Sequence, residues 1–287
     1  MELDRPSVIV ALLTPFDEDG RVDESALSAH IDRLVDAGID ALMPCGTTGE
    51  SALLSDEELA GVVRATCAAA AGRVPVLAHV GRPGTAPTLE LARRAVADGA
   101  EAISAVVPYY YPVGSDEIRA HYAALVEGLG GTPVYAYTIP ERTHNELDPA
   151  LLPQLIEDGL RGLKDSTKSV ERHAEYASAA AGSHAPFDLL VGTTSLVLDA
   201  LHGGSAGAVL AVANLHPELC VELARAFRED RHADVGWLQQ ELAAVEQELQ
   251  GGGAIPSLKR ALAERIEGYG PALRSPLGVA GPVRSTG

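Results

Sequence analysis

The sequence predicts one large α/β domain in which eight parallel strands close into a (β/α)8 TIM barrel, followed by a C-terminal helical extension. Three observations lead to this class. Short apolar runs alternate eight times with longer, alanine-rich amphipathic segments, as is typical of a parallel sheet. The first run continues into Thr14-Pro15-Phe16-Asp17, without the glycine-rich fingerprint common in open doubly wound sheets. The length of 287 residues suits one barrel with additions.

Each apolar run is close in length to a barrel strand. The predicted strands are residues 7–13, 41–44, 74–80, 102–107, 134–137, 162–164, 189–191 and 206–210. The predicted helices are residues 23–37, 55–71, 85–97, 115–127, 148–157, 169–181 and 196–201. Asp23 is the expected cap of the first helix, and Ser55 with Glu58 resembles a capping box. Four glycines that follow helices are expected to be left-handed stops: Gly38, Gly72, Gly99 and Gly159.

The alternation ends near residue 215. Residues 1–214 are therefore the predicted catalytic barrel. Residues 215–270 form the predicted helical extension packed on it, with helices at 233–250 and 255–266. The last stretch, 271–287, is rich in proline, glycine and serine and is predicted to be a loosely ordered tail.

Composition narrows the classes of function. The formal net charge of −18 would repel a polyanion, so no nucleic-acid partner is expected. Cys45, Cys67 and Cys220 form no zinc spacing, and their odd number indicates a reducing compartment. The apolar run near the N-terminus is too short for a signal peptide, and no stretch approaches the roughly 20 apolar residues of a membrane helix. We therefore expect a cytoplasmic protein without a membrane partner.

Barrel enzymes carry their sites where the strands end, so the polar residues there are the candidates. The second predicted strand ends in Cys45-Gly46-Thr47-Thr48-Gly49. Two hydroxyls between glycines can form a cradle for a small anion, because the glycines let backbone N–H groups turn toward a carboxylate. An ordinary glycine turn with solvated threonines is the alternative from the residues alone.

Tyrosines gather at the next strand ends. Tyr109, Tyr110 and Tyr111 follow the fourth predicted strand, while Tyr135 and Tyr137 belong to the fifth and share one face. A buried tyrosine hydroxyl needs a partner, so a hydroxyl relay near the threonine loop is one interpretation. Aromatic packing at the rim of the barrel is the other.

Lys164 lies in the sixth predicted strand, in the run Gly162-Leu163-Lys164-Asp165. The chain has three lysines against nineteen arginines, so a lysine inside a strand is unusual here. Burial lowers the pKa of an amine, and a neutral amine is a nucleophile toward a ketone. Asp165 is the obvious ion-pair partner, but adjacent strand residues face opposite ways. Lys164 is therefore the predicted nucleophile.

Taken together, these residues resemble the dihydrodipicolinate synthase / N-acetylneuraminate lyase family of Schiff-base aldolases, over roughly residues 5–265. The order and spacing of several motifs carry the resemblance. The motifs are Gly46-Thr47-Thr48-Gly49-Glu50, Pro108-Tyr109-Tyr110, Tyr137-Thr138-Ile139-Pro140, Gly162-Leu163-Lys164-Asp165, and the Gly203-Gly204 to Gly207 loop that leads to Asn214.

The resemblance implies a role for each site residue. Lys164 would form the imine with pyruvate or a similar 2-keto acid, and Tyr137 would move the proton as general acid and base. Thr47 would bond to Tyr137, and Tyr110 would complete the relay from a neighbouring subunit of a homodimer or homotetramer. The keto-acid carboxylate would bind to Thr47 and Thr48. Further pocket residues implied by the resemblance are Gly46, Gly192 and Val209. No cofactor and no metal is implied.

The second substrate is the open question at this point. Arg142 matches an arginine that binds the aldehyde's carboxylate in synthase-type members, which join pyruvate to aspartate semialdehyde. Thr138, His144 and the Gly192-Thr193-Thr194 loop depart from that subgroup, and the tyrosine-rich strand ends look more like those of sugar-acid aldolases. The synthase-type reaction is the first expectation. A 2-keto-3-deoxy sugar-acid aldolase or an N-acetylneuraminate lyase-like enzyme is the alternative.

Two other classes compete with a Schiff-base lyase. A metal-dependent barrel enzyme would need a cluster of histidines and carboxylates, and His79 is the only histidine at a strand end that is placed to be a ligand. A satisfied rim histidine is the simpler interpretation of His79. A non-catalytic barrel would be suggested by loss of the lysine or of Tyr137, and both are present.

Overall fold

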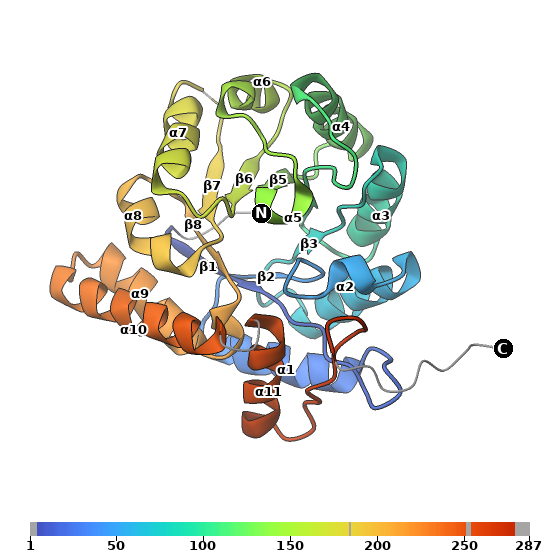
Figure 1. The fold of residues 1–287 in the computed structure, drawn as a ribbon, viewed down its shortest axis with the longest axis vertical. Helices are drawn as coiled ribbons and strands as arrows, with labels where there is room; N and C mark the ends of the chain where they lie inside the picture. The colour runs from blue at the N-terminus through green and yellow to red at the C-terminus, as the bar shows by residue number, and fades with distance from the viewer. Residues whose placement is uncertain (1–4, 184, 251–253, 279–287) are drawn as a thin grey trace.

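The computed structural model describes residues 5–183, 185–250 and 254–278. Within them, eight strands form one parallel sheet in the order β2-β1-β8-β7-β6-β5-β4-β3, and a parallel bridge between Leu42 and Val76 links its two ends. The predicted (β/α)8 barrel is confirmed, and Figure 1 shows the helices ringing the strands. The strands are β1 Ser7–Ala11, β2 Ala41–Met43, β3 Leu77–His79, β4 Ala102–Val106, β5 Val134–Thr138, β6 Gly162–Asp165, β7 Asp188–Val191 and β8 Gly207–Leu210.

Helices follow the strands as the sequence predicts. They are α1 Glu24–Asp36, α2 Asp56–Ala70, α3 Thr85–Ala97, α4 Ser115–Gly128, α6 Leu152–Glu157, α7 Val170–Ala181 and α8 Val197–His202. Asp23 accepts the N–H of Ala26, and Ser55 with Glu58 makes the expected capping box. The four glycines predicted to be helix stops all have positive φ. Two details differ from prediction: residues 149–151 form a 3-10 turn ahead of α6, and the short helix α5 Pro140–Thr143 is additional.

Strand alternation sorts side chains between the barrel interior and the surrounding helices. The interior cluster holds small and aliphatic residues together with Tyr135 and Tyr137. Lys164 pairs in register with Tyr137 across β5 and β6, so both project from the same face. Leu163, its neighbour in sequence, packs in the outer cluster under the helices. The alternation thus brings an amine into an apolar barrel interior.

The chain beyond the barrel forms α9 Pro217–Arg228, α10 His232–Gln250 and α11 Ala254–Arg265, which lie along one side near α1 and α8 (Figure 1). Leu258 and Leu262 of α11 share a small apolar cluster with Leu13 and Ala26. The segment predicted to be a loose tail divides in two. Residues 271–278 return to the barrel, where Arg274 N donates to Glu50, and residues 279–287 lie outside the described part.

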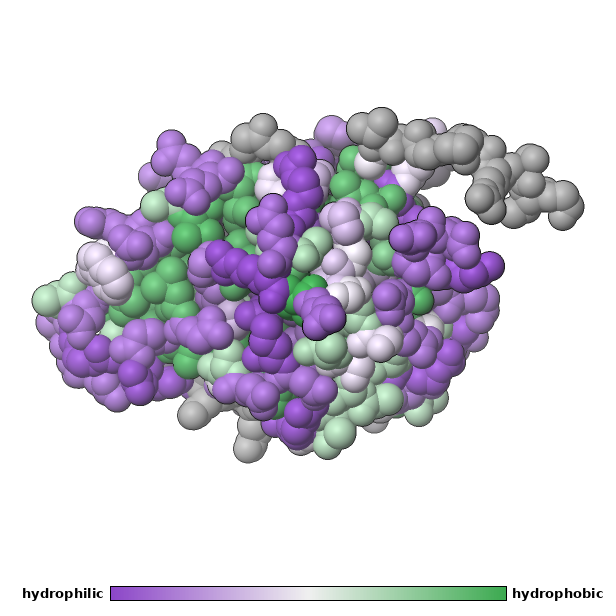
Figure 2. All heavy atoms as spheres, turned by 90° about the horizontal axis from the view of Figure 1, so that it is seen from below, coloured by the Kyte–Doolittle hydropathy of each residue, from purple (hydrophilic) through white to green (hydrophobic). Residues whose placement is uncertain are grey.

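The visible surface is largely polar. Figure 2 shows hydrophilic residues over much of the visible face, with apolar residues between them. No helix in the described part of the chain is both long and apolar enough to cross a membrane.

Candidate active site

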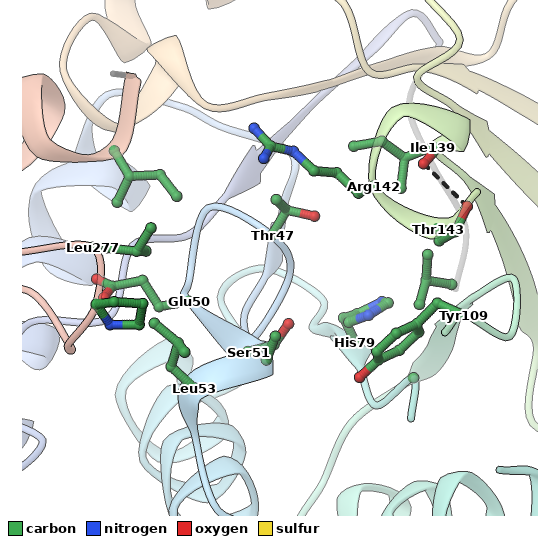
Figure 3. Close-up of a pocket in the computed structure, with 15 residues that line it drawn as sticks. Thr47, Glu50, Ser51, Leu53, His79, Tyr109, Ile139, Arg142, Thr143 and Leu277 are labelled. Carbon is green, nitrogen blue, oxygen red and sulfur yellow. Dashed lines mark hydrogen bonds between the residues drawn. The ribbon is translucent and has the colours of Figure 1, made fainter. Parts of the chain in front are cut away.

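A cavity of about 340 Å³ opens at the carboxyl ends of the strands, where barrel enzymes place their chemistry. The loop after β2 contributes Thr47, β3 ends in His79, and the loop after β5 contributes Ile139. Figure 3 shows these side chains around the opening, with Arg142 above Thr47. The remaining lining residues are Glu50, Ser51, Ala52, Leu53, Gly81, Val106, Tyr109, Thr143, Ile255, Pro276 and Leu277.

Lys164 is not one of the residues that line this cavity. It is buried in the barrel interior, with 5% of its surface exposed, next to Tyr137, whose hydroxyl bonds to the lining residue Thr47. Its Nζ lies 3.9 Å from Met43 Sδ and 4.1 Å from the centroid of the Tyr137 ring. Asp165 points the other way, as predicted, and bonds to His173 Nδ1 at 2.8 Å. No carboxylate in the described part of the chain forms an ion pair with Lys164. The amine is therefore held against an aromatic face without a neutralising acid.

The tyrosine relay is present in part. Tyr137 OH lies 3.2 Å from Thr47 Oγ1, a distance at which either hydroxyl can donate. Tyr135 shares the interior face, as expected, but it does not join the relay, because its hydroxyl donates to Asp188 at 2.6 Å. Burial and this carboxylate raise the pKa of Tyr135. Within the described chain, the hydroxyl pair thus consists of Thr47 and Tyr137.

Tyr110 lies away from this pair. It is 80% exposed, has a φ of 79°, and makes an edge-to-face contact with Tyr111, with ring centroids 5.0 Å apart. No hydrogen bond joins it to Thr47 or Tyr137 within the described chain. Tyr109, which the sequence grouped with Tyr110 and Tyr111 without a role of its own, is the member of this tyrosine run that lines the cavity.

Among the pocket residues implied by the resemblance, Gly192 packs against the Lys164 side chain. A Cβ at Gly192 would stand 2.1 Å from Ser166 Oγ and 3.0 Å from Lys164 Cε, so a side chain there would displace Ser166 and crowd the lysine. Val209 belongs to the interior cluster with Tyr137. Gly46 is buried in the threonine loop, and the partly buried Thr48 side chain makes no hydrogen bond to a described residue and does not line the cavity.

Arg142 is exposed on α5 and lines the cavity. The acids that might have neutralised it are occupied: Glu141 pairs with Lys168 at 2.5 Å, and Glu146 pairs with Arg172 at 2.8 Å. Arg142 itself has no ion-pair partner among the described residues. Its guanidinium is therefore available to an anion at the mouth of the cavity.

Two features of the site were not predicted as such. His79, which the sequence suggested was a rim histidine or, less simply, a metal ligand, lines the cavity. Among the described residues, no group of three His, Cys, Asp or Glu side chains could hold a metal ion. Ile255, Pro276 and Leu277 come from the C-terminal part and form one wall. No local pattern signals that wall, because it depends on contacts between segments far apart in the chain.

Comparisons with known proteins agree with this geometry. Residues 5–282 match the model of the dihydrodipicolinate synthetase family. An uncharacterized DapA-like lyase of Halobacterium salinarum is 37% identical over 94% of this chain and 87% of its own. The 4-hydroxy-tetrahydrodipicolinate synthase of Hyphomonas neptunium is 36% identical over 94% and 91%.

Solved structures give the same result. The crystal structure of YagE, a prophage protein of the dihydrodipicolinic acid synthase family from E. coli K12 in complex with pyruvate, has a TM-score of 0.90 at 28% identity and covers 98% of this chain and 94% of its own. Dihydrodipicolinate synthase from Aquifex aeolicus has a TM-score of 0.87 at 30% identity, over 96% and 93%. The motifs that carry the resemblance, the barrel and these relatives all agree, and the chain belongs to the dihydrodipicolinate synthetase family of lyases.

Proposed function

We propose that this protein is a class I lyase that forms a Schiff base between Lys164 and pyruvate, or a similar 2-keto acid. The observation that carries the proposal is the Lys164 amine, which is buried in the barrel interior, lies over the Tyr137 ring and has no carboxylate partner in the described chain. A buried amine without a counter-charge is suited to attack a ketone.

The chemistry follows from the positions of the three side chains. Lys164 Nζ adds to the keto carbon, and water leaves to give the imine. The protonated imine withdraws electrons, so the neighbouring methyl carbon loses a proton and becomes an enamine carbon. That carbon attacks an aldehyde: a C–C bond forms, the aldehyde C=O π bond breaks, and its electron pair accepts a proton on oxygen. Tyr137, bonded to Thr47 at 3.2 Å, is placed to carry these protons. Water then hydrolyses the resulting imine, which releases the product and returns the free Lys164 amine; cleavage is the reverse sequence.

The keto-acid carboxylate would lie against the Gly46-Thr47-Thr48 loop. Thr47 lines the cavity, and the buried glycines on either side of the two threonines allow a tight turn there. Gly192 and Val209 would complete the walls around the pyruvate carbons, since Gly192 leaves room for Lys164 Cε and Val209 packs in the cluster of Tyr137.

For the second substrate we propose aspartate semialdehyde, which makes the protein an enzyme of the 4-hydroxy-tetrahydrodipicolinate synthase type. The unpaired guanidinium of Arg142 at the cavity mouth supports an aldehyde that carries a carboxylate. Curated relatives of that name, at 33–37% identity, support it further. A 2-keto-3-deoxy sugar-acid aldolase remains the alternative, because Thr47, Ser51 and Thr143 line the same cavity and could bind hydroxyl groups.

We further propose that the active form is a homodimer or homotetramer in the cytoplasm. The three free cysteines suit the reducing environment of the cytoplasm.

The oligomer is supported by Tyr110, which is 80% exposed and does not bond to Thr47 or Tyr137 of the same chain, as suits a residue that serves a neighbouring subunit. Mixing inactive Lys164→Ala and Tyr110→Phe proteins under subunit exchange should restore part of the activity. Proven exchange without recovery would show that each chain is self-sufficient.

The decisive experiment traps the imine. With pyruvate and borohydride, mass spectrometry should find one reduced adduct per chain, mapped to Lys164. Lys168→Ala is the matched control, because Lys168 is exposed and paired with Glu141, and this variant should label like the parent. Equal labelling of a Lys164→Ala variant would refute the proposal. A panel of aldehydes with pyruvate, run beside the cleavage of 2-keto-3-deoxy sugar acids, then separates the two second substrates.

A further inference from the structure

His79 is the one histidine in the described chain that lines the catalytic cavity. It is the last residue of β3 and is only 2% exposed. In Figure 3 its ring lies at the edge of the opening, between Ser51 and Tyr109. The proposed chemistry, which uses Lys164, Tyr137 and Thr47, leaves this imidazole without a role.

The ring of His79 is fixed by its surroundings. It meets the Tyr137 ring edge to face, with centroids 5.7 Å apart and an interplanar angle of 83°. Its Nδ1 lies 3.4 Å from Ser104 Oγ, since β3 and β4 place these two residues opposite each other. Gly81 leaves space for the ring, because a Cβ there would come within 3.2 Å of His79 Cε1. No described group bonds to Nε2.

The charge state of His79 is also fixed. Burial, together with the nearby positive charges of Lys164 and Arg82, lowers its pKa to about 3. The imidazole is therefore neutral at physiological pH, and only one of its nitrogens carries a proton. If the Ser104 hydroxyl donates to Nδ1, that proton is on Nε2, and His79 is a neutral hydrogen-bond donor.

We propose that His79 is a catalytic residue that donates a hydrogen bond from Nε2 to the carbonyl oxygen of the second substrate. This inference rests on the proposed function. When the enamine carbon attacks, the aldehyde π bond breaks and negative charge develops on that oxygen. A fixed donor stabilises this charge, while Tyr137 supplies the proton that the oxygen finally keeps. The edge contact keeps the imidazole ring of His79 next to the ring of Tyr137, the proton source.

The test separates the pyruvate half of the reaction from C–C bond formation. His79→Phe keeps an aromatic ring beside Tyr137 but removes the donor, and His79→Gln keeps an N–H donor. His121→Phe is the matched control, since His121 is also buried and neutral but bonds to Thr85 away from the cavity. Each protein is assayed for borohydride trapping of pyruvate, for deuterium exchange of the pyruvate methyl group by NMR, and for condensation with aspartate semialdehyde, succinic semialdehyde and glyceraldehyde.

We expect His79→Phe to trap and exchange pyruvate like the parent, while its condensation rate falls on the order of 10²-fold, as for loss of one oxyanion donor. His79→Gln should recover part of that rate, and His121→Phe should match the parent. Equal losses in exchange and condensation would show that His79 only positions Tyr137, and an unchanged condensation rate would remove His79 from the reaction. A parent protein that traps no pyruvate on Lys164, or condenses none of the aldehydes, would instead refute the proposed function, and with it this role.

Discussion

The Lys259 ammonium lies 2.5 Å from the Glu50 carboxylate, and neither side chain is exposed to solvent. Lys259 belongs to α11, whereas Glu50 closes the loop that carries Thr47. Arg274 N also donates to Glu50, at 2.8 Å, and Lys259 lies over the ring of Phe16. The ion pair therefore joins the C-terminal part of the chain to the loop of the active site. Burial lowers the pKa of Lys259 to about 8, although Glu50 opposes that shift.

Removal of one partner should be costly. Lys259→Met leaves Glu50 buried without its counter-charge, and breaking a buried pair in this way typically costs about 3–5 kcal/mol. We expect that loss in the free energy of unfolding, measured with urea. The double variant Lys259→Met/Glu50→Gln should recover part of it. Lys168→Met, which breaks the exposed pair with Glu141, is the control and should cost about 0–1 kcal/mol. A Lys259→Met protein as stable as this control would contradict the prediction.

A second prediction concerns the Tyr137 hydroxyl. Tyr137→Phe keeps the ring under Lys164 and beside His79 but removes the hydrogen bond to Thr47. Loss of a general acid and base should lower kcat by about 10²–10⁴-fold, with little change in the melting temperature. Tyr135→Phe is the matched control: it removes a hydroxyl that bonds to the buried Asp188, so it should lower stability and retain turnover. If Tyr135→Phe lost turnover while Tyr137→Phe retained it, Tyr137 would not be the proton carrier.

The strands and the inward direction of Lys164 could be predicted because they depend on local pattern. Apolar runs locate the strands, and a period of two residues places Lys164 and Asp165 on opposite faces. Helix caps such as Asp23 and Ser55 are equally local. The four-residue helix α5 lies below the length at which periodicity gives a signal, so its discovery needed the structure.

The parts of the site that were missed depend on long-range contacts. Leu277 reaches the cavity because Arg274 and Lys259 bond to Glu50, and nothing in a proline- and glycine-rich segment indicates that pairing. Tyr135 and Tyr137 have the same residue type and face. They differ because the Tyr135 hydroxyl donates to Asp188, which keeps it out of the relay, and the position of Asp188 depends on the fold.

A third prediction concerns acid stability. Burial lowers the pKa of His121 from the ordinary 6.5 to about 4. Burial likewise lowers the pKa of His30 to about 4. Between these values the unfolded chain binds a proton that the folded chain does not, so the free energy of unfolding falls as pH decreases through this window. His121→Phe should lose about 2 kcal/mol less than the parent between pH 7 and pH 5, measured by urea unfolding. The carboxylates titrate alike in both proteins, so their contribution cancels in the difference between variant and parent. Parallel pH profiles would show that His121 takes up its proton in the fold.

The last prediction concerns Arg142, the cation at the cavity mouth that has no ion-pair partner in the described chain. Its planar fork of donors suits a carboxylate, and a charge-assisted hydrogen bond is worth roughly 1.5–3 kcal/mol. Arg142→Ala should therefore lower kcat/KM for aspartate semialdehyde by about ten- to a hundred-fold, through a higher KM for the aldehyde. The KM for pyruvate should change far less, because pyruvate is held by Lys164 and the threonine loop.

Two comparisons make this prediction specific to a carboxylate on the aldehyde. Arg142→Lys keeps the charge but loses the planar fork of donors, so its kcat/KM for aspartate semialdehyde should lie between the values of the parent and of Arg142→Ala. Propionaldehyde, which has no carboxylate, should be used equally poorly by all three proteins. A sugar-acid aldolase would instead show a modest effect of Arg142→Ala on a polyhydroxylated substrate. Equal, small changes for both substrates would mean that Arg142 is an exposed surface cation, because a charge that binds the aldehyde must distinguish it from pyruvate.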